Sequence, residues 1–298
     1  MSTILVVGAT GMLGREICRQ LTAAGRNVRG LVRESSDPGR VSELQALGVE
    51  TVSGDVRDRS SLERACEGVE AVISTVSAMP FSYQPGVNDI QTVDLEGVTS
   101  LIEAAKAKDV SHFIHTSISG NINTDFPLNN AKREVERRLR ESGLVYTILR
   151  ASFFMEAWLS PAVGFDPANA KAAIYGTGQN PLSWIAVQDV ARFAVASLDH
   201  PAAKNATLEL GGPEAISPLH AVKLFEQANG RPFELSFVPE EALEAQQAAA
   251  TDPMQKSFIA LMRFVAAGDP IEMTDTLRTF SIKPMSVEEY ARQRVSAA

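Results

Sequence analysis

The stretch ILVVGATGMLG at residues 4–14 joins a run of apolar residues to three evenly spaced glycines. Four consecutive apolar residues, 4–7, predict a strand that is buried on both faces of a parallel sheet. Apolar positions at helical spacing over residues 15–24 predict a helix after the glycines. A glycine turn between a strand and a helix is where bare backbone binds a diphosphate, although glycines also form ordinary tight turns. We therefore predict a dinucleotide site at this turn.

The three glycines have separate expected roles. Gly8 permits the tight turn, Gly11 allows the diphosphate to approach closely, and Gly14 lets the helix pack closely on the strand. The residues of this turn that we expect to contact the cofactor are Gly8, Thr10, Gly11, Met12, Leu13 and Gly14.

Strands and helices alternate along the chain after this turn. Further strands are predicted at 27–32, 50–52, 70–75, 112–116, 144–149 and 207–210, and helices at 40–47, 60–66, 88–108, 131–142 and 187–198. This alternation predicts an α/β fold, a Rossmann-type doubly wound parallel sheet. We expect a nucleotide-binding domain at 1–150, to which 181–212 return. A smaller, mainly helical substrate cap is expected at 151–180 and 213–298.

Composition narrows the class of protein. The 298 residues are 45% hydrophobic and 21% charged, as in ordinary soluble globular proteins. A net charge of −8 argues against a nucleic-acid surface, and the basic run 132–140 is interleaved with glutamates, which is typical of a solvated helix face. No apolar run reaches membrane-spanning length, and Met1–Thr3 leads directly into the first strand without a signal peptide. With Cys18 and Cys66 expected as buried thiols, a cytoplasmic protein is predicted.

Arg33 follows the second predicted strand, where a dinucleotide fold faces the adenosine ribose. An arginine there accommodates a 2′-phosphate, whereas an acidic residue would hold a 2′-hydroxyl. Arg33 therefore favours NADP(H), with NAD(H) left open, and Ser35, Ser36 and Arg40 could add phosphate contacts. The alternative is a surface arginine at the start of a loop.

Ligands in such folds bind beyond the carboxyl ends of the strands. Asp55 follows the third strand and could accept a hydrogen bond from the adenine amino group or cap the next helix. The residues at strand ends that we expect at the cofactor are Asp55, Val56, Ser74, Thr75, Val76, Thr116 and Ser117.

Several motifs together resemble one family. They are GATGMLG (8–14), LVR (31–33), GDVRD (54–58), HFIHTS (112–117), AKREVERRLRESGLVYTILRASFFME (131–156) and WIAVQDVA (184–191). The chain resembles NmrA-like atypical short-chain dehydrogenases/reductases, which are related to isoflavone and phenylcoumaran reductases. Members include reductases, redox-sensing regulators that bind NADP(H) without turnover, and assembly factors, so the resemblance implies NADP(H) binding and leaves the activity open.

The same resemblance implies a role for Lys132. Short-chain reductases normally use Tyr-x-x-x-Lys, but Leu128 stands at the tyrosine position before Lys132. The position of the assisting serine falls on Ile118, with Ser117 and Ser119 beside it. In the isoflavone-reductase branch a lysine acts without the tyrosine, as a general base or as electrostatic support. The alternative for Lys132 is a contact to the ribose hydroxyls without proton transfer.

An aromatic run after the sixth strand predicts an apolar substrate pocket. Its expected residues are Met79, Phe153, Phe154, Met155 and Trp158, although core packing explains some of them equally well. His112 and His115 lie three apart on one strand and so point to opposite faces, which excludes a metal pair, and we predict no metal site.

Two functions fit these observations. The first is an NADPH-dependent reductase of a small apolar carbonyl, quinone or enone, with Lys132 as the catalytic residue. The second is a redox sensor or scaffold that binds NADP(H) and a protein partner, which Leu128 favours. A homodimer is compatible with both functions, and no membrane partner is expected.

Overall fold

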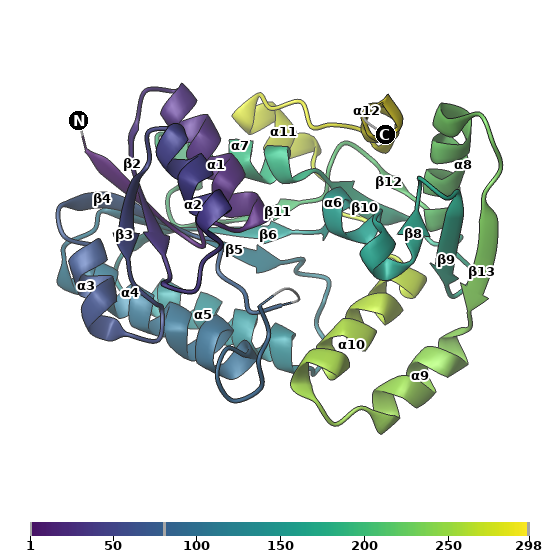
Figure 1. Ribbon diagram of the computed structural model, residues 1–298, viewed down its shortest axis with the longest axis horizontal. Coiled ribbons are helices and arrows are strands. Elements are labelled where there is room, and N and C mark those ends of the chain that lie inside the picture. Colours follow the sequence, from purple (N-terminus) through teal and green to yellow (C-terminus); the bar gives the residue numbers. More distant parts are fainter. Residues whose placement is uncertain (1, 80–81, 297–298) are drawn as a thin grey trace. The chain divides into compact units, whose positions relative to one another are not determined.

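The computed structural model describes residues 2–79 and 82–296. The segment Met1–Thr3, for which no signal peptide was predicted, includes Met1, which lies outside the described residues. The chain forms two compact units (Figure 1). The first unit comprises Met1–Ile118, Pro127–Arg150 and Val190–Leu208, and the second comprises Ser119–Phe126, Ala151–Asp189 and Glu209–Ala298. Among the described residues, no helix is both long and apolar enough to cross a membrane.

A seven-stranded sheet organises the first unit, in the order β11-β6-β5-β4-β1-β2-β3. Its strands are β1 (Thr3–Val7), β2 (Asn27–Val32), β3 (Glu50–Ser53), β4 (Val69–Ser74), β5 (His112–Ile118), β6 (Val145–Ala151) and β11 (Ala206–Leu210). The pairs of β1 with β2 and β4, of β2 with β3, and of β4 with β5 are all parallel. The strand order reverses between β1 and β4, where ligands bind in doubly wound sheets. The predicted Rossmann-type fold is confirmed.

Helices cover both faces of this sheet. They are α1 (Met12–Ala23), α2 (Pro38–Ala46), α3 (Arg59–Ala65), η1 (Ile90–Gly97), α4 (Val98–Ala107), α5 (Pro127–Glu141) and α7 (Val187–Ser197), with the short η3 (Pro201–Ala203). Figure 1 shows α3, α4 and α5 on one face and α1, α2 and α7 on the other. On the first of these faces Val72 and Phe113 of the sheet pack against Leu101 of α4 and Val135 of α5.

The single helix predicted over 88–108 is divided in the structure. Residues Ile90–Gly97 form the π-helix η1, and α4 continues from Val98. Asp89 and Thr92 form a capping box that fixes the start of η1. Gly97 packs closely on Val56, because a Cβ on this glycine would lie 2.7 Å from a Val56 methyl group. π-helical turns are frequent at functional sites, and this one carries the buried residue Asp94.

Cys18 and Cys66 are buried free thiols, as predicted. Burial raises the pKa of each to about 12, so neither has the character of a reactive thiolate.

The second unit contains helices and two small three-stranded sheets, β12-β10-β7 and β13-β9-β8. Its elements are β7 (Phe153–Phe154), α6 (Met155–Trp158), η2 (Pro161–Val163), β8 (Phe165–Asp166), β9 (Lys171–Tyr175), β10 (Leu182–Ile185), β12 (Ala215–Ile216), α8 (Pro218–Asn229), β13 (Glu234–Val238), α9 (Glu240–Ala249), α10 (Pro253–Ala267), α11 (Thr274–Phe280) and α12 (Val287–Ser296). Phe225 of α8 packs edge to face against Phe165, with ring centroids 5.0 Å apart, and contacts Phe233 and Tyr290. The sequence pattern predicted a mainly helical region here but not these sheets.

Candidate active site

The glycine turn connects β1 to α1 and exposes mainly backbone, because Gly8, Gly11 and Gly14 carry no side chains. Gly11 is the N-cap of α1, and no side chain caps the helix there. Gly8 has φ +89°, and a Cβ on Gly14 would lie 2.2 Å from the Gly8 carbonyl oxygen. A Cβ on Gly8 would also lie 2.6 Å from Thr75 Oγ1 after β4. The turn therefore leaves backbone N–H groups at a helix N-terminus uncapped, as a diphosphate requires.

The remaining predicted residues of this turn occupy its tip and the first residues of α1. Thr10 lies in the turn, Leu13 is nearly buried at 9% exposure, and Met12 is 38% exposed. Val56, after β3, belongs to the hydrophobic core instead of facing solvent.

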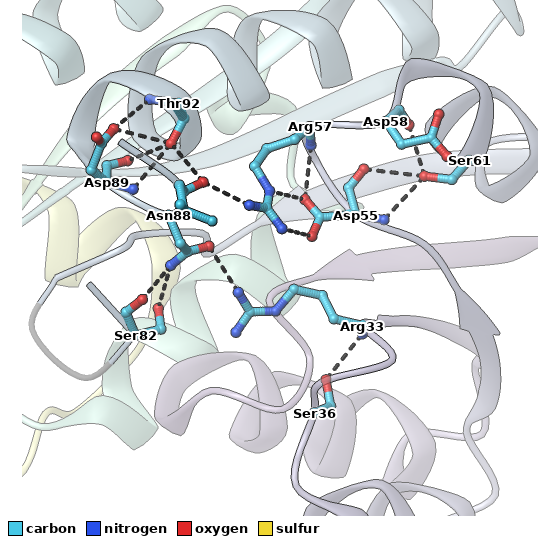
Figure 2. A network of polar contacts seen from close by, with 11 residues as sticks. Arg33, Ser36, Asp55, Arg57, Asp58, Ser61, Ser82, Asn88, Asp89 and Thr92 are labelled. Carbon is cyan, nitrogen blue, oxygen red and sulfur yellow. Dashed lines mark hydrogen bonds and ion pairs between the residues drawn. The ribbon is translucent and has the colours of Figure 1, made fainter. Parts of the chain in front are cut away.

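Arg33, at the end of β2, has its side chain held by a neutral group (Figure 2). Its Nη1 donates to Oδ1 of Asn88 over 2.9 Å, and its backbone N–H donates to Ser36 Oγ over 3.0 Å. Asn88 is buried and in turn donates from Nδ2 to the carbonyl and hydroxyl oxygens of Ser82. A guanidinium thus stands at the end of β2 with a neutral hydrogen-bond acceptor. The predicted second cation, Arg40, lies near the glycine turn, with Nη1 3.5 Å from the Thr10 carbonyl oxygen.

Asp55 forms a bidentate ion pair with Arg57 in the same region (Figure 2). Arg57 Nη2 lies 2.6 Å from Asp55 Oδ2, and Nε lies 2.8 Å from Oδ1. The hydrogen bond from Arg57 holds the pKa of Asp55 below its usual range, although burial opposes it, and the charge of Arg33 adds to the effect. Helix α3 is capped by Asp58, which accepts the Ser60 N–H, so the capping role considered for Asp55 is wrong.

Lys132 of α5 is buried in an ion pair with Asp94 of η1. Its Nζ lies 3.0 Å from Asp94 Oδ1, and the two side chains are 5% and 0% exposed. Nζ also donates to the Val76 carbonyl oxygen over 3.3 Å, and Asp94 Oδ2 accepts the Ala78 N–H over 3.0 Å. The pair therefore joins α5 and η1 to the segment that follows β4. Leu128, one turn before Lys132 on α5, is 5% exposed.

Three polar side chains with buried polar atoms lie on β4 and β5, with Ser74 at the end of β4 and His115 and Thr116 within β5. Ser74 Oγ, Thr116 Oγ1 and both ring nitrogens of His115 are buried without a hydrogen-bond partner in the part of the chain that the structure describes. Burial lowers the pKa of His115 to about 3, and the charge of Lys132 acts in the same direction, so the imidazole is neutral at pH 7. Hydroxyl groups without partners at the strand ends are suited to contact a ligand.

Ser117 is engaged elsewhere, because its hydroxyl donates to Glu136 Oε1 over 2.6 Å. Glu136 is fully buried on α5 and also pairs with Arg133, Arg140 and Arg150. Burial alone would raise the pKa of Glu136, but the hydrogen bonds from Arg150 and Ser117 and the charges of Arg133 and Arg150 outweigh it and lower the pKa to about 2.

The interpretation of 132–140 as a solvated helix face is wrong for two of its charged residues. Lys132 and Glu136 are 4% and 0% exposed, whereas Arg137 and Arg138 are exposed and pair with Glu134. The reason is that Lys132 and Glu136 lie one turn apart on the side of α5 that also carries Val135 and Leu139 in the core.

The predicted substrate-pocket residues differ in their burial. Phe153 and Met155 are 3% and 0% exposed in the second unit, where Phe153 packs edge to face on Trp158 at 5.0 Å. Trp158 and Phe154 are half-buried, and Trp158 also stacks on Phe258 at 5.9 Å. Met79 is half-buried in the first unit, after β4. The alternative of core packing holds for Phe153 and Met155, and the pocket assignment stays a prediction.

Asn88, Asp94 and the role of Glu136 were not predicted from the sequence. A signal existed for Asp94, which interrupts the apolar face of the predicted helix four residues after Ile90. Asn88 gave no such signal, because it lies in the loop before η1. Among residues 2–79 and 82–296, no group of three or more His, Cys, Asp or Glu side chains could hold a metal ion.

The chain is similar to several known proteins. A model of the NmrA-like family matches residues 1–291. The (4-alkanoyl-5-oxo-2,5-dihydrofuran-3-yl)methyl phosphate reductase of Streptomyces griseus is similar at 31% identity, over 94% of this chain and 93% of that protein. A photosystem II assembly factor of Trieres chinensis is 30% identical over 80% of this chain and 72% of that protein. The solved structure of AtPrR2 with NADP+ and (+)pinoresinol shares the fold, with a TM-score of 0.79 at 21% identity over 98% of each chain.

Proposed function

The chain belongs to the NmrA-like family, and from this premise we propose that it is an NADP(H)-dependent oxidoreductase. Its substrate in this proposal is a small apolar carbonyl, quinone or enone. The relatives support the general activity, because reductases occur among them, and the solved structure of AtPrR2 contains NADP+.

The first unit supplies the groups that NADP(H) requires. The uncapped N-terminus of α1 and the glycine turn would bind the diphosphate, and Arg33 would bind the 2′-phosphate. Asp55 would accept a hydrogen bond from the adenine amino group. The hydroxyl groups of Ser74 and Thr116 would form hydrogen bonds to the cofactor. A bound nicotinamide would supply the hydride, and these residues would orient it and stabilise the charge that develops on the substrate.

The observation that carries the proposal is the buried pair of Lys132 and Asp94. An ammonium group excluded from water acts strongly on negative charge that develops on a substrate oxygen. In this proposal Lys132 Nζ also donates the proton that such an oxygen needs. Leu128, at the position of the usual catalytic tyrosine, has no proton to give. Asp94 fixes the direction of Nζ, so little reorganisation is needed during the reaction.

The test of this function is NADPH consumption, followed at 340 nm with a panel of quinones and enones. We expect at least one substrate to be reduced. The sensor or scaffold function is favoured by Leu128 and by the assembly-factor relative, and it predicts NADPH binding without consumption of any substrate.

Gly11→Val should abolish NADPH binding and leave the fold formed, because a branched side chain would occupy the place of the diphosphate. A Cβ at Gly11 would lie 3.1 Å from the Gly8 carbonyl oxygen, a tight contact that requires a small local shift, and among the described residues beyond its chain neighbours it meets no other atom within 4 Å. Loss of two charge-assisted hydrogen bonds corresponds to roughly 3–6 kcal/mol of binding free energy. Fluorescence titration of NADPH, with circular dichroism as the control for folding, measures the effect. Wild-type affinity in the folded variant would place the phosphate site elsewhere.

Arg33→Ala should weaken NADPH binding by about 1–3 kcal/mol, as expected for one charge-assisted contact to the 2′-phosphate. The affinity for NADH should change little, because NADH has no phosphate at this position. Titration with both cofactors tests the assignment, and an equal loss for both would refute it.

A further inference from the structure

Two guanidinium groups lie in the network of Figure 2, and they differ in the charge of their partners. Arg57 is paired with the Asp55 carboxylate through two hydrogen bonds of 2.6 and 2.8 Å, and its Nη1 donates to the Val87 carbonyl oxygen over 2.6 Å. The side chain of Arg33 donates to the amide oxygen of Asn88 over 2.9 Å. The charge of Arg57 is therefore compensated within the protein, whereas no ion-pair partner of Arg33 occurs in residues 2–79 and 82–296.

We propose that Asn88 is a positioning residue that determines the preference for NADP(H) over NAD(H), by holding the Arg33 guanidinium through a neutral hydrogen bond instead of a direct ion pair. This inference rests on the proposed function, because it assumes that Arg33 meets the 2′-phosphate. It assigns the selectivity to a residue 55 positions away from Arg33 in the chain.

Asn88 itself is held in one orientation. Its side chain is buried at 5% exposure, and Nδ2 donates to the carbonyl and hydroxyl oxygens of Ser82. Its backbone exchanges two hydrogen bonds of 2.8 Å with Gln84. With Nδ2 directed at two acceptors, Oδ1 is left to receive the Arg33 N–H. The amide is thus fixed before any cofactor arrives.

A fixed amide benefits phosphate binding in two ways. It restricts a long side chain that would otherwise lose rotamer freedom on binding. It also does so without a negative charge, which would repel the 2′-phosphate and compensate the guanidinium. An aspartate at this position would restrict Arg33 as well but would remove the charge that the phosphate needs.

The experiment measures dissociation constants for NADPH, NADH, 2′,5′-ADP and 5′-AMP by titration at constant ionic strength. Asn88→Asp should weaken the binding of NADPH and 2′,5′-ADP roughly 10- to 100-fold. It should change the affinity for NADH and 5′-AMP less than about threefold. Asn88→Ala, which removes the support without adding charge, should weaken NADPH about three- to tenfold. The matched control is Gln45→Glu, which adds the same charge at an exposed position of α2 and should leave the ratio of NADPH to NADH affinity near wild type.

A double-mutant cycle separates positioning of Arg33 from a general structural role. In the Arg33→Ala background, Asn88→Ala should have little further effect on NADPH, because its effect acts through Arg33. Should Asn88→Asp fail to fold, Asn88→Ala and this cycle still decide the question. If the Asn88 variants weakened the binding of NADPH and NADH equally, the inference would be overturned. The same holds if the effects of Asn88→Ala and Arg33→Ala on NADPH affinity were additive. Failure of wild-type protein to bind either cofactor would instead refute the proposed function.

Discussion

Lys132→Ala lowers the rate at saturating NADPH by roughly 10²–10⁴ in the mechanism proposed here, the usual range for loss of a general acid or base. The saturated rate is the decisive quantity, because it excludes any loss of cofactor affinity. Single-turnover measurements of NADPH oxidation with a substrate from the quinone and enone panel would record it. A variant with the full saturated rate would show that the proton comes from another donor.

The same substitution also acts on stability. Asp94 is 0% exposed and pairs with Lys132, so removal of the lysine leaves an unpaired buried carboxylate. Breaking one side of a buried ion pair costs about 3–5 kcal/mol. The double variant Lys132→Met with Asp94→Asn removes both charges and should regain much of this stability in urea unfolding, yet its rate should stay low. Recovery of the rate together with stability would mean that Lys132 acts only as part of the fold.

Glu136→Gln should lower the free energy of unfolding by about 3 kcal/mol at pH 7. The carboxylate is buried among Arg133, Arg140, Arg150 and Ser117, and its pKa is about 2, compared with an ordinary value of 4.5. A carboxyl group whose pKa is lower in the folded state stabilises the protein above its ordinary pKa. This contribution is lost as the pH falls from about 4.5 to about 2. The difference in free energy of unfolding between wild type and variant should therefore become smaller over that range.

Glu134→Gln is the matched control on the same helix. The pKa of Glu134 is also about 2, because Arg137 and Arg138 donate hydrogen bonds to it, but these groups are exposed to solvent. Solvent and salt screen such pairs, so this variant should change stability little. A difference between wild type and Glu136→Gln that does not vary between pH 7 and pH 3 would contradict the ionised state assigned to Glu136.

Local patterns in the sequence were sufficient to predict the central sheet and the glycine turn. Residues 4–14 specify a buried strand, a turn and a helix in one continuous segment, and the turn requires glycine because a Cβ on Gly14 would strike the Gly8 carbonyl oxygen. Lys132 and Leu128 were singled out through the family resemblance of the continuous segment that carries them, which forms one helix. Features of this kind depend on neighbours a few residues away, and such neighbours are visible in a sequence.

The partners of the charged residues depended on chain segments that meet only after folding. Sequence position alone did not indicate that Asn88 would hold Arg33, that Asp94 would pair with Lys132, or that Glu136 would be buried among three arginines. The same holds for the two small sheets of the second unit, whose strands are short and, apart from the local pair of β8 with β9, join distant segments of the chain. Helical and strand periodicity predicts which face is buried, but the identity of the opposing side chain depends on how separate elements pack. For Arg57 and Arg33, that packing distinguishes a guanidinium paired with a carboxylate from one that is held by a neutral amide.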